Sequence, residues 1–324
     1  MAIRRDDRCG AGRWAIDDDA CAGPAFHRSR KRPLRFRVTA MAQKSVAPAA
    51  PRLNPAQARI LIDTARKITG VAISTDKLSF LELRVSRRLR ELGCQDYDGY
   101  VDLLRGPNGA AEARYLAEAL TTHTTSFFRE KVHYDWLERE GLPSLVEDGA
   151  GIDRKLTIWS AACSLGSEMW TAAMVLEQFS QARKGGLMWE VMGTDVSRQI
   201  LRQAAAAVFT EDQIAGIPDD LRRSYLLRSR GEPRLYRIVP ELRSRARLAW
   251  ANLVDLDRKL QITADVAFLR NVLIYFQPED QRRAVEGVVS RLRHGGYLLT
   301  GHSESLADPP ANLRQIAAST YQKV

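Results

Sequence analysis

The chain has 324 residues, of which 45% are apolar, and it is therefore long enough for one large domain and a smaller one. No run of eighteen apolar residues occurs, so we expect no membrane insertion, and the four widely spaced cysteines form no C-x-x-C pair, as expected for reduced thiols in a cytoplasmic protein. The net charge of +10 divides into +5 for residues 1–40 (ten Lys or Arg against five Asp or Glu) and +5 for the remainder (39 against 34). The body is only mildly basic, so we expect no nucleic-acid partner.

Residues 1–50 combine arginine clusters, an acidic run at Asp17–Asp19 and an Ala/Pro-rich stretch, without helical or strand periodicity. This composition is typical of a disordered extension. Met41 sits just before a normal-looking start, which suggests the hypothesis that residues 1–40 are an upstream extension from a misplaced start codon. Mass spectrometry of the native N-terminus tests it.

Residues 51–140 are predicted to form an N-terminal helical domain. Its first helix begins with Asn54 as N-cap and Pro55 at the first helical position, and it ends at Gly70. Further helical patterns cover residues 96–104 and 111–121.

A second helix is predicted over residues 77–92, with Gly93 as its stop. Its apolar residues recur at roughly helical spacing, namely Phe80, Leu83, Leu89 and Leu92. Its polar side carries an arginine cluster of Arg84, Arg87, Arg88 and Arg90. A solvated face is one interpretation of this cluster, and a docking surface for an acidic partner helix is the other.

Residues 120–130, LTTHTTSFFRE, are a polar run interrupted by Phe127 and Phe128. Neither a core helix nor a plain linker needs this mixture. The run either serves a ligand or caps a helix, with the two phenylalanines as plugs between domains. A helix from about 130 to 140 and a glycine-rich linker follow.

Residues 156–174, LTIWSAACSLGSEMWTAAM, are patterned as a strand, a small-residue turn at Gly166 and a helix. In an α/β sheet such a turn lies at the carboxyl end of a strand, where a ligand can reach backbone atoms and the N–H groups of the helix N-terminus. The G-x-G-x-x-G fingerprint is absent. A cofactor loop and an ordinary turn are therefore both compatible with this stretch.

The next segment begins at Trp189 and repeats the pattern of strand followed by helix. Asp195 ends the strand, and Ser197 is the predicted N-cap of the helix. A carboxylate at this position can accept hydrogen bonds from both hydroxyls of a ribose. The alternative is that Asp195 has only a structural capping role.

Residues 207–250 alternate like short antiparallel strands around a turn at Gly231–Pro233. Strand patterns return at residues 264–276, a helix follows from Pro278, and two closing strands give an antiparallel edge. The predicted fold class is α/β: an N-terminal all-α domain, followed at residues 150–324 by a Rossmann-like sheet that carries an inserted antiparallel β subdomain at about 225–250.

Six segments together resemble the CheR family of chemotaxis methyltransferases: LTTHTTSFFRE, WSAACSLGSE, GTDVS, ANLVD, FLRNVLIYF and GGYLLTGHSES. The resemblance covers about residues 50–324. It implies a class I S-adenosylmethionine-dependent methyltransferase sheet. It also implies methylation of chemoreceptor glutamates, that is, a protein-glutamate O-methyltransferase that releases S-adenosylhomocysteine.

The resemblance also implies roles for individual residues. The cofactor-binding residues would be His123, Thr125, Arg129, Glu168, Asp195, Asn252, Leu253, Leu269 and Arg270. Asp195 would hold the ribose, and Asn252 and Leu253 would flank the adenine. Arg129 and Tyr275 would be catalytic. The receptor would dock on Arg84, Arg87 and Arg88, and the expected partners are the cytoplasmic methylation helices of chemoreceptors, bound by a monomeric enzyme.

The sequence bears on two alternative functions. The turn Gly166–Trp170 reads Gly-Ser-Glu-Met-Trp where the family usually has Gly-Glu-Glu-Pro-Tyr, which motivates a relative that has lost turnover and acts as a binding module. A nucleic-acid methyltransferase should show an Asn/Asp-Pro-Pro-Tyr-like turn, and the sequence Arg270–Leu273 argues against one. The five histidines are scattered and none pairs at ligand spacing, so we expect no metal site.

Overall fold

The computed structural model describes residues 52–72, 78–107, 109–121, 124–256 and 260–324. The extension at residues 1–50 and His123 lie outside the described residues. None of the helices within the described ranges is long and apolar enough to cross a membrane.

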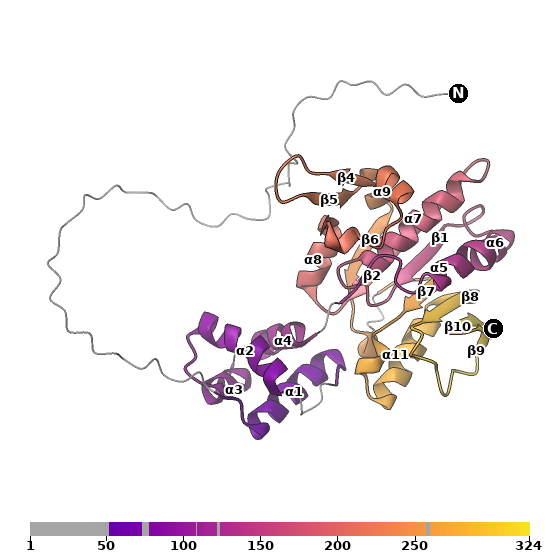
Figure 1. The fold of residues 1–324 in the computed structure, drawn as a ribbon. Coiled ribbons are helices and arrows are strands. Elements are labelled where there is room, and N and C mark those ends of the chain that lie inside the picture. Colours follow the sequence, from indigo (N-terminus) through magenta and orange to yellow (C-terminus); the bar gives the residue numbers. More distant parts are fainter. Residues whose placement is uncertain (1–51, 73–77, 108, 122–123, 257–259) are drawn as a thin grey trace, which may run out of the picture. The chain divides into compact units, whose positions relative to one another are not determined.

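The N-terminal region is built from four helices around their own core (Figure 1). They are α1 (Pro55–Thr69), α2 (Leu78–Leu92), α3 (Tyr97–Arg105) and α4 (Gly109–Leu120). The predicted boundaries of α1 are confirmed: Asn54 and Gln57 form a reciprocal capping box, and Gly70 ends the helix in the left-handed conformation with φ 74°. Fully buried side chains of all four helices form the core, among them Leu61, Leu81, Tyr100 and Leu116.

The predicted apolar face of α2 is partly wrong. The residues that α2 buries are Leu81, Val85 and Leu89, which are spaced four residues apart. Leu83 is instead 72% exposed and Leu92 is 38% exposed. A helix has only one face toward the core, and the stripe through Val85 occupies that face.

Three short helical segments connect the two regions of the chain: α5 (Val132–Trp136), the π-helical turn η1 (Leu137–Gly141) and α6 (Leu142–Glu147). They confirm the helix predicted from about residue 130. Phe127 precedes them and is buried edge-on against Phe209 at a centroid distance of 4.9 Å.

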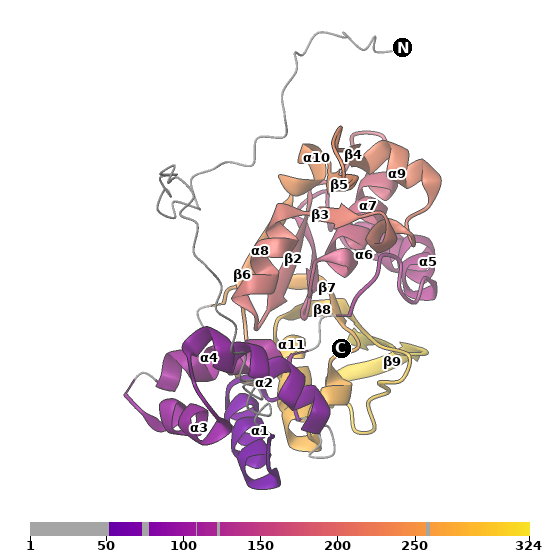
Figure 2. The same cartoon turned by 60° about the vertical axis from the view of Figure 1, so that its left-hand side comes forward.

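The main sheet has seven strands in the order β6-β2-β1-β7-β8-β10-β9. Strands β6, β2, β7, β8 and β9 are labelled in Figure 2. Their bounds are β1 (Leu156–Ser160), β2 (Trp189–Asp195), β6 (Ala246–Trp250), β7 (Ala264–Leu269), β8 (Leu292–Thr300), β9 (Leu313–Ala317) and β10 (Thr320–Lys323). Strands β6, β2, β1, β7 and β8 are parallel, and β10 pairs antiparallel with both β8 and β9. The predicted antiparallel edge is confirmed.

Side chains of the central strands alternate between two cores, one on each face of the sheet. Ile158 packs on the side covered by α7 (Ser167–Gln181), whereas Trp159 packs on the side covered by α11 (Pro278–Ser290). The remaining helices are α8 (Arg198–Ala206), α9 (Asp219–Tyr225), α10 (Pro240–Arg243) and the 3-10 turns η2 (Asp212–Ile214), η3 (Leu253–Asp255) and η4 (Leu273–Tyr275). Burial on both faces explains why β1 and β2 are buried at every position.

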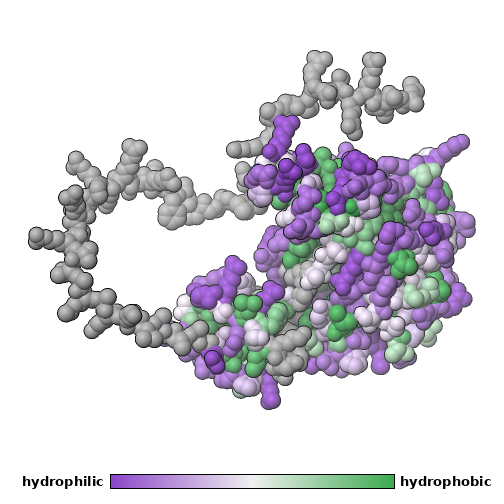
Figure 3. Space-filling model, in the orientation of Figure 1, coloured by the Kyte–Doolittle hydropathy of each residue, from purple (hydrophilic) through white to green (hydrophobic). Residues whose placement is uncertain are grey.

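A separate antiparallel sheet has the order β3-β5-β4, with β3 at Val208–Thr210, β4 at Leu226–Arg228 and β5 at Leu235–Ile238. Residues 246–250, which alternation grouped with these antiparallel strands, form instead the parallel strand β6 at one edge of the main sheet. The side chains of β6 are half-buried or exposed and partly alternate, so its sequence resembles that of an antiparallel strand with one solvated face. Apolar residues are scattered among hydrophilic ones on the surface drawn in Figure 3.

Candidate functional site

A pocket lies where the carboxyl ends of β1, β2 and β7 meet. The strand order reverses at β1, which has β2 on one side and β7 on the other, and ligands of open α/β sheets bind at such a point. Eight of the predicted site residues line the pocket: Thr125, Arg129, Glu168, Asp195, Asn252, Leu253, Arg270 and Tyr275. Sequence segments up to 150 residues apart thus contribute to one cavity.

Other predicted site residues lie elsewhere. Leu269 is fully buried at the end of β7 and packs in the core on the α11 side, so its side chain is not part of the pocket lining. Arg84, Arg87 and Arg88 are on α2 and are not part of the lining either.

The turn after β1 brings backbone atoms to the pocket. Gly166 adopts the left-handed conformation with φ 90°, and a Cβ there would come within 3.2 Å of both Trp170 and Ala204, which only glycine avoids. The Cys163 N–H donates to the Thr194 carbonyl at 2.8 Å, and burial raises the pKa of the Cys163 thiol well above its usual value. Ser164, which the sequence analysis did not single out, lines the pocket beside them.

Asp195 is positioned by two backbone N–H groups. Its Oδ2 accepts from Ser164 N at 3.0 Å, and its Oδ1 accepts from Ser197 N at 2.9 Å. The predicted N-cap is confirmed at Ser197, whose Oγ accepts from Ile200 N at 3.2 Å. The cap of α8 is therefore Ser197, and Asp195 instead connects the first two βα turns beside the pocket. A carboxylate accepts several hydrogen bonds at once, so this arrangement is compatible with ribose binding.

Arg270, which directly follows β7, is held from several sides. Its Nη2 lies 3.2 Å from Glu130 Oε2, and its Nη1 lies 3.3 Å from both Glu168 Oε2 and the Tyr134 hydroxyl. A further hydrogen bond goes to the Arg129 carbonyl. Burial alone would lower the pKa of Arg270, but Glu168, Tyr134 and Glu130 together outweigh burial and raise that pKa. The guanidinium is therefore charged and fixed.

Glu168 connects the first turn of α7 to this arginine. Its Oε1 accepts from the Ser160 hydroxyl at 2.7 Å, and its side chain is only 14% exposed. Burial raises the pKa of Glu168, and the charge of Arg270 opposes that rise. The pocket thus has an acidic and a basic group side by side at its floor.

Glu304 holds the segment that carries Tyr275. This buried carboxylate accepts from the backbone N–H groups of Asn271, Ile274 (3.2 Å) and Gly301 (2.9 Å). Because three N–H groups from two separate turns converge on one side chain, Glu304 fixes the path of the chain after β7. Glu304 lies in the segment GHSES, and no local sequence pattern predicts this role.

The helical region supplies one wall of the pocket. Thr69 and Val71 line it, and Val71 pairs with Phe276 in an isolated antiparallel bridge. The Asn252 amide donates to the Ile68 carbonyl at 2.7 Å. Asn252 therefore has two positions in the structure: it lines the pocket, and its amide connects the sheet region to the end of α1.

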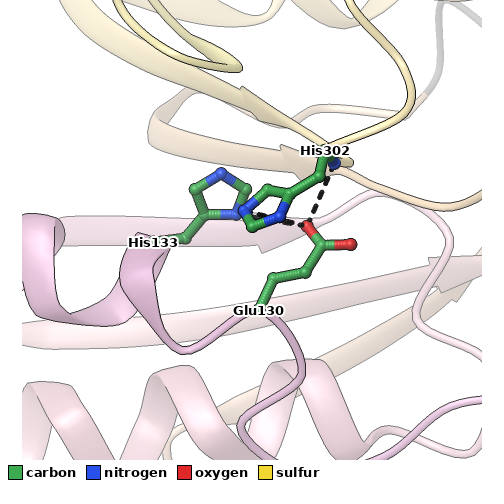
Figure 4. Close-up of side chains that lie close together, drawn as sticks. All are labelled: Glu130, His133 and His302. Atoms are coloured by element: carbon green, nitrogen blue, oxygen red, sulfur yellow. Dashed lines mark hydrogen bonds and ion pairs between the residues drawn. The ribbon is translucent and has the colours of Figure 1, made fainter.

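Glu130, His133 and His302 form a cluster (Figure 4). Glu130 also forms the ion pair with Arg270. His133 Nδ1 lies 3.5 Å and His302 Nε2 lies 3.9 Å from Glu130 Oε2, and the two imidazole rings pack edge to face at 5.0 Å. No histidines pair at ligand spacing in the sequence, but the fold brings His133 and His302 together. His133 is on α5, whereas His302 follows β8 and lies 169 positions later in the sequence.

Comparisons with known proteins agree with this geometry. Residues 123–322 match the family described as "CheR methyltransferase, SAM binding domain", and residues 57–121 match "CheR methyltransferase, all-alpha domain". A chemotaxis protein methyltransferase of Borreliella burgdorferi is 30% identical over 78% of this chain and 89% of its own length. Those of Klebsiella aerogenes and Vibrio cholerae (number 2) are each 31% identical over 74% of this chain and over 79% and 82% of their lengths.

Proposed function

Because the chain belongs to the CheR methyltransferase family, we propose that it transfers a methyl group from S-adenosylmethionine to glutamate carboxylates of chemoreceptors. The observation that carries this proposal is the pocket at the ends of β1, β2 and β7, where Asp195 and the Glu168–Arg270 pair lie together. A carboxylate can accept hydrogen bonds from the ribose hydroxyls. A neighbouring carboxylate and guanidinium can pair with the ammonium and carboxylate groups at the amino-acid end of the cofactor.

The proposed reaction requires the glutamate carboxylate and the sulfonium methyl group to be aligned, and it requires no general base. A glutamate side chain is already a carboxylate at pH 7, so its oxygen can attack the sulfonium methyl without a general base. The new O–CH3 bond forms as the CH3–S bond breaks, and neutral S-adenosylhomocysteine leaves. The enzyme must hold the two reactants in line and exclude water. No described lining residue is a cysteine or a histidine, which is consistent with this mechanism.

For the cofactor, we assign Asp195 to the ribose and Asn252 and Leu253 to the adenine. The lining positions Thr125 and Glu168 would contact the remainder of the molecule, as would Arg270. His123 belongs to this proposed set through the family resemblance alone. Leu269 would act through its backbone and its neighbour Arg270, because its side chain is in the core.

For the methyl-transfer end, we assign Arg129 and Tyr275 to the glutamate carboxylate. The Arg270 guanidinium is engaged by Glu130 and Glu168. Arg129 also lines the pocket, and the one described hydrogen bond of its guanidinium is a long one, 3.4 Å to the Thr124 carbonyl. Arg129 can therefore turn toward an anionic substrate at low cost.

For docking, we propose that exposed arginines of α2 attract the acidic methylation helix of a receptor in the cytoplasm, and that a monomer suffices. Arg84 and Arg87 are exposed. Arg88 is not equivalent to them, because its guanidinium makes two hydrogen bonds to Glu112, at 2.7 and 2.9 Å, and lies 3.8 Å from the Tyr115 ring. We therefore place docking on Arg84 and Arg87 and give Arg88 a structural role.

The proposal is tested with the purified full chain, a receptor cytoplasmic fragment and S-adenosylmethionine carrying a labelled methyl group. We expect label in the receptor that alkali releases as methanol, the behaviour of a carboxyl methyl ester, and no label when the modified glutamates are replaced by glutamine. Calorimetric titration with S-adenosylhomocysteine is the second measurement. Binding without transfer would favour the binding-module function, and neither binding nor transfer would contradict the assignment of the pocket.

A further inference from the structure

The cluster of Glu130, His133 and His302 contains the ligand types of a transition-metal site. The ligand atoms that the three side chains offer all lie within 4.8 Å of one another. In a tetrahedral zinc site with bonds of about 2.0–2.1 Å, neighbouring ligand atoms lie about 3.3 Å apart. The pairs at 3.5 and 3.9 Å are already close to that separation. Small side-chain rotations would complete the geometry.

His133 provides an independent sign that a ligand belongs here. Its side chain is 3% exposed, and among the described residues neither ring nitrogen makes a hydrogen bond, although Nδ1 lies 3.5 Å from Glu130 Oε2. A buried polar group without a hydrogen bond is destabilising, and a bound ion would offset that cost.

The charges around the cluster favour a dication. The carboxylates of Glu130 and Glu168 share one guanidinium, that of Arg270. The carboxylates therefore outnumber the cation beside the cluster, and a bound metal ion would add the missing positive charge.

We propose that Glu130, His133 and His302 bind one divalent transition-metal cation of the zinc class, with the fourth position open to water. His302 is 54% exposed, so the ion can enter from solvent. Imidazole nitrogens and a carboxylate oxygen are ligands that Zn²⁺ shares with Co²⁺ and Ni²⁺, whereas Mg²⁺ and Ca²⁺ prefer oxygen alone.

Occupancy of the site would act on the pocket through Glu130. The metal would coordinate Glu130 Oε2, the same atom that lies 3.2 Å from Arg270 Nη2. Arg270 would then lose part of its anchoring beside Glu168. We therefore expect the bound cation to reduce methyl transfer, and a chelator to restore it.

The test titrates Zn²⁺ into the chelator-treated full chain by calorimetry in a non-chelating buffer, without cofactor or receptor, so that the result does not depend on the proposed function. We expect one site in the wild type. His302→Ala and His133→Phe should each weaken Zn²⁺ binding at least about tenfold. Even mutation of a residue that only hydrogen-bonds to a metal ligand typically lowers metal affinity 10- to 100-fold. His133→Phe keeps the buried ring and removes its nitrogens. His294→Ala, which changes an exposed histidine of β8, is the matched control and should bind as the wild type does.

Two results would overturn the proposal: no binding by the wild type, or binding that neither variant weakens. In the second case the ion is held elsewhere, for example by the cysteines of the N-terminal extension. A Co²⁺ absorption spectrum supports the assignment if it shows no thiolate charge-transfer band and if it is lost in His302→Ala. Because His302 is exposed, this variant is expected to fold and decides the question even if His133→Phe does not.

Discussion

At the scale of single residues, Asp195 combines an observed structural role with the ribose-binding role proposed for it. Its two oxygens accept from Ser164 N and Ser197 N, and the same side chain lines the pocket. Asp195→Ala is expected to weaken S-adenosylhomocysteine binding by about 1–3 kcal/mol, because the ribose loses a charged acceptor. Calorimetry measures the change. Asp195→Asn is the control that keeps one acceptor oxygen and should lose less, and unchanged affinity in both variants would leave Asp195 with only its structural role.

Arg129 and Arg270 line the same pocket but should respond differently to substitution. Arg129→Ala is expected to remove most methyl transfer and leave the unfolding midpoint nearly unchanged, because Arg129 makes one long hydrogen bond within the described structure. Arg270→Ala leaves Glu130 and Glu168 without their cation. Breaking such a buried pair costs roughly 3–5 kcal/mol. Urea unfolding and a transfer assay on both variants separate the two roles, and near-normal turnover of Arg129→Ala would contradict its assignment.

At the scale of elements, the arginines of α2 differ in role: Arg88 is paired with Glu112, whereas Arg84, Arg87 and Arg90 are exposed. Reversing Arg84, Arg87 and Arg90 to Glu should slow receptor methylation, by about tenfold at low salt, and flatten its salt dependence, while cofactor affinity stays the same. The attraction is screened beyond a Debye length of about 8 Å at physiological salt. The measurement is the initial methylation rate as a function of salt concentration.

Two controls make the α2 experiment specific. Reversing three exposed arginines on other elements, Arg139, Arg282 and Arg314, changes the net charge equally and should have a smaller effect on the rate. Arg88→Glu should instead destabilise the fold by roughly 3–5 kcal/mol, because it places a second carboxylate against the buried Glu112. If methylation survives the α2 reversal with its salt dependence intact, the receptor docks elsewhere.

Sequence patterns predicted the elements whose signals are local. The capping residues of α1, the turn at Gly166 and the cap at Ser197 were all found where local sequence placed them. Strand β6 was assigned to the wrong sheet, and the buried face of α2 was partly misjudged. In both cases the local pattern fits two arrangements, and contacts with distant segments decide between them.

The candidate site could be predicted only where one segment carried a signal or the family resemblance supplied one. Asp195 was found from its place at a strand end. The role of Glu304 and the proximity of His133 to His302 depend on β8 lying beside β7, which no local pattern reveals. The partners of Arg88 likewise come from a different helix, so its structural role was not visible in the periodicity of α2.

At the scale of the whole molecule, the helical region and the sheet share one pocket. Thr69 and Val71 line it from the helical side, and the Val71–Phe276 bridge and the Asn252–Ile68 hydrogen bond join the two regions. S-adenosylhomocysteine at 100 times its dissociation constant should stabilise the native state by about 2.7 kcal/mol. Scanning calorimetry is expected to show a single transition that shifts as a unit. Two transitions, only one of which moves, would show that the helical region unfolds independently.

The thiol of Cys163 lies 1% exposed in the turn after β1, directly under the backbone that borders the pocket. A reagent that alkylates thiols can reach this sulfur only when the turn opens. The labelling rate of Cys163, followed by mass spectrometry of the peptide that contains it, therefore reports how often the turn opens. The partly exposed Cys94 is the internal reference. Bound cofactor should lower the alkylation rate of Cys163 and leave that of Cys94 unchanged. The ratio of the two rates then measures pocket occupancy without a receptor or a labelled methyl group.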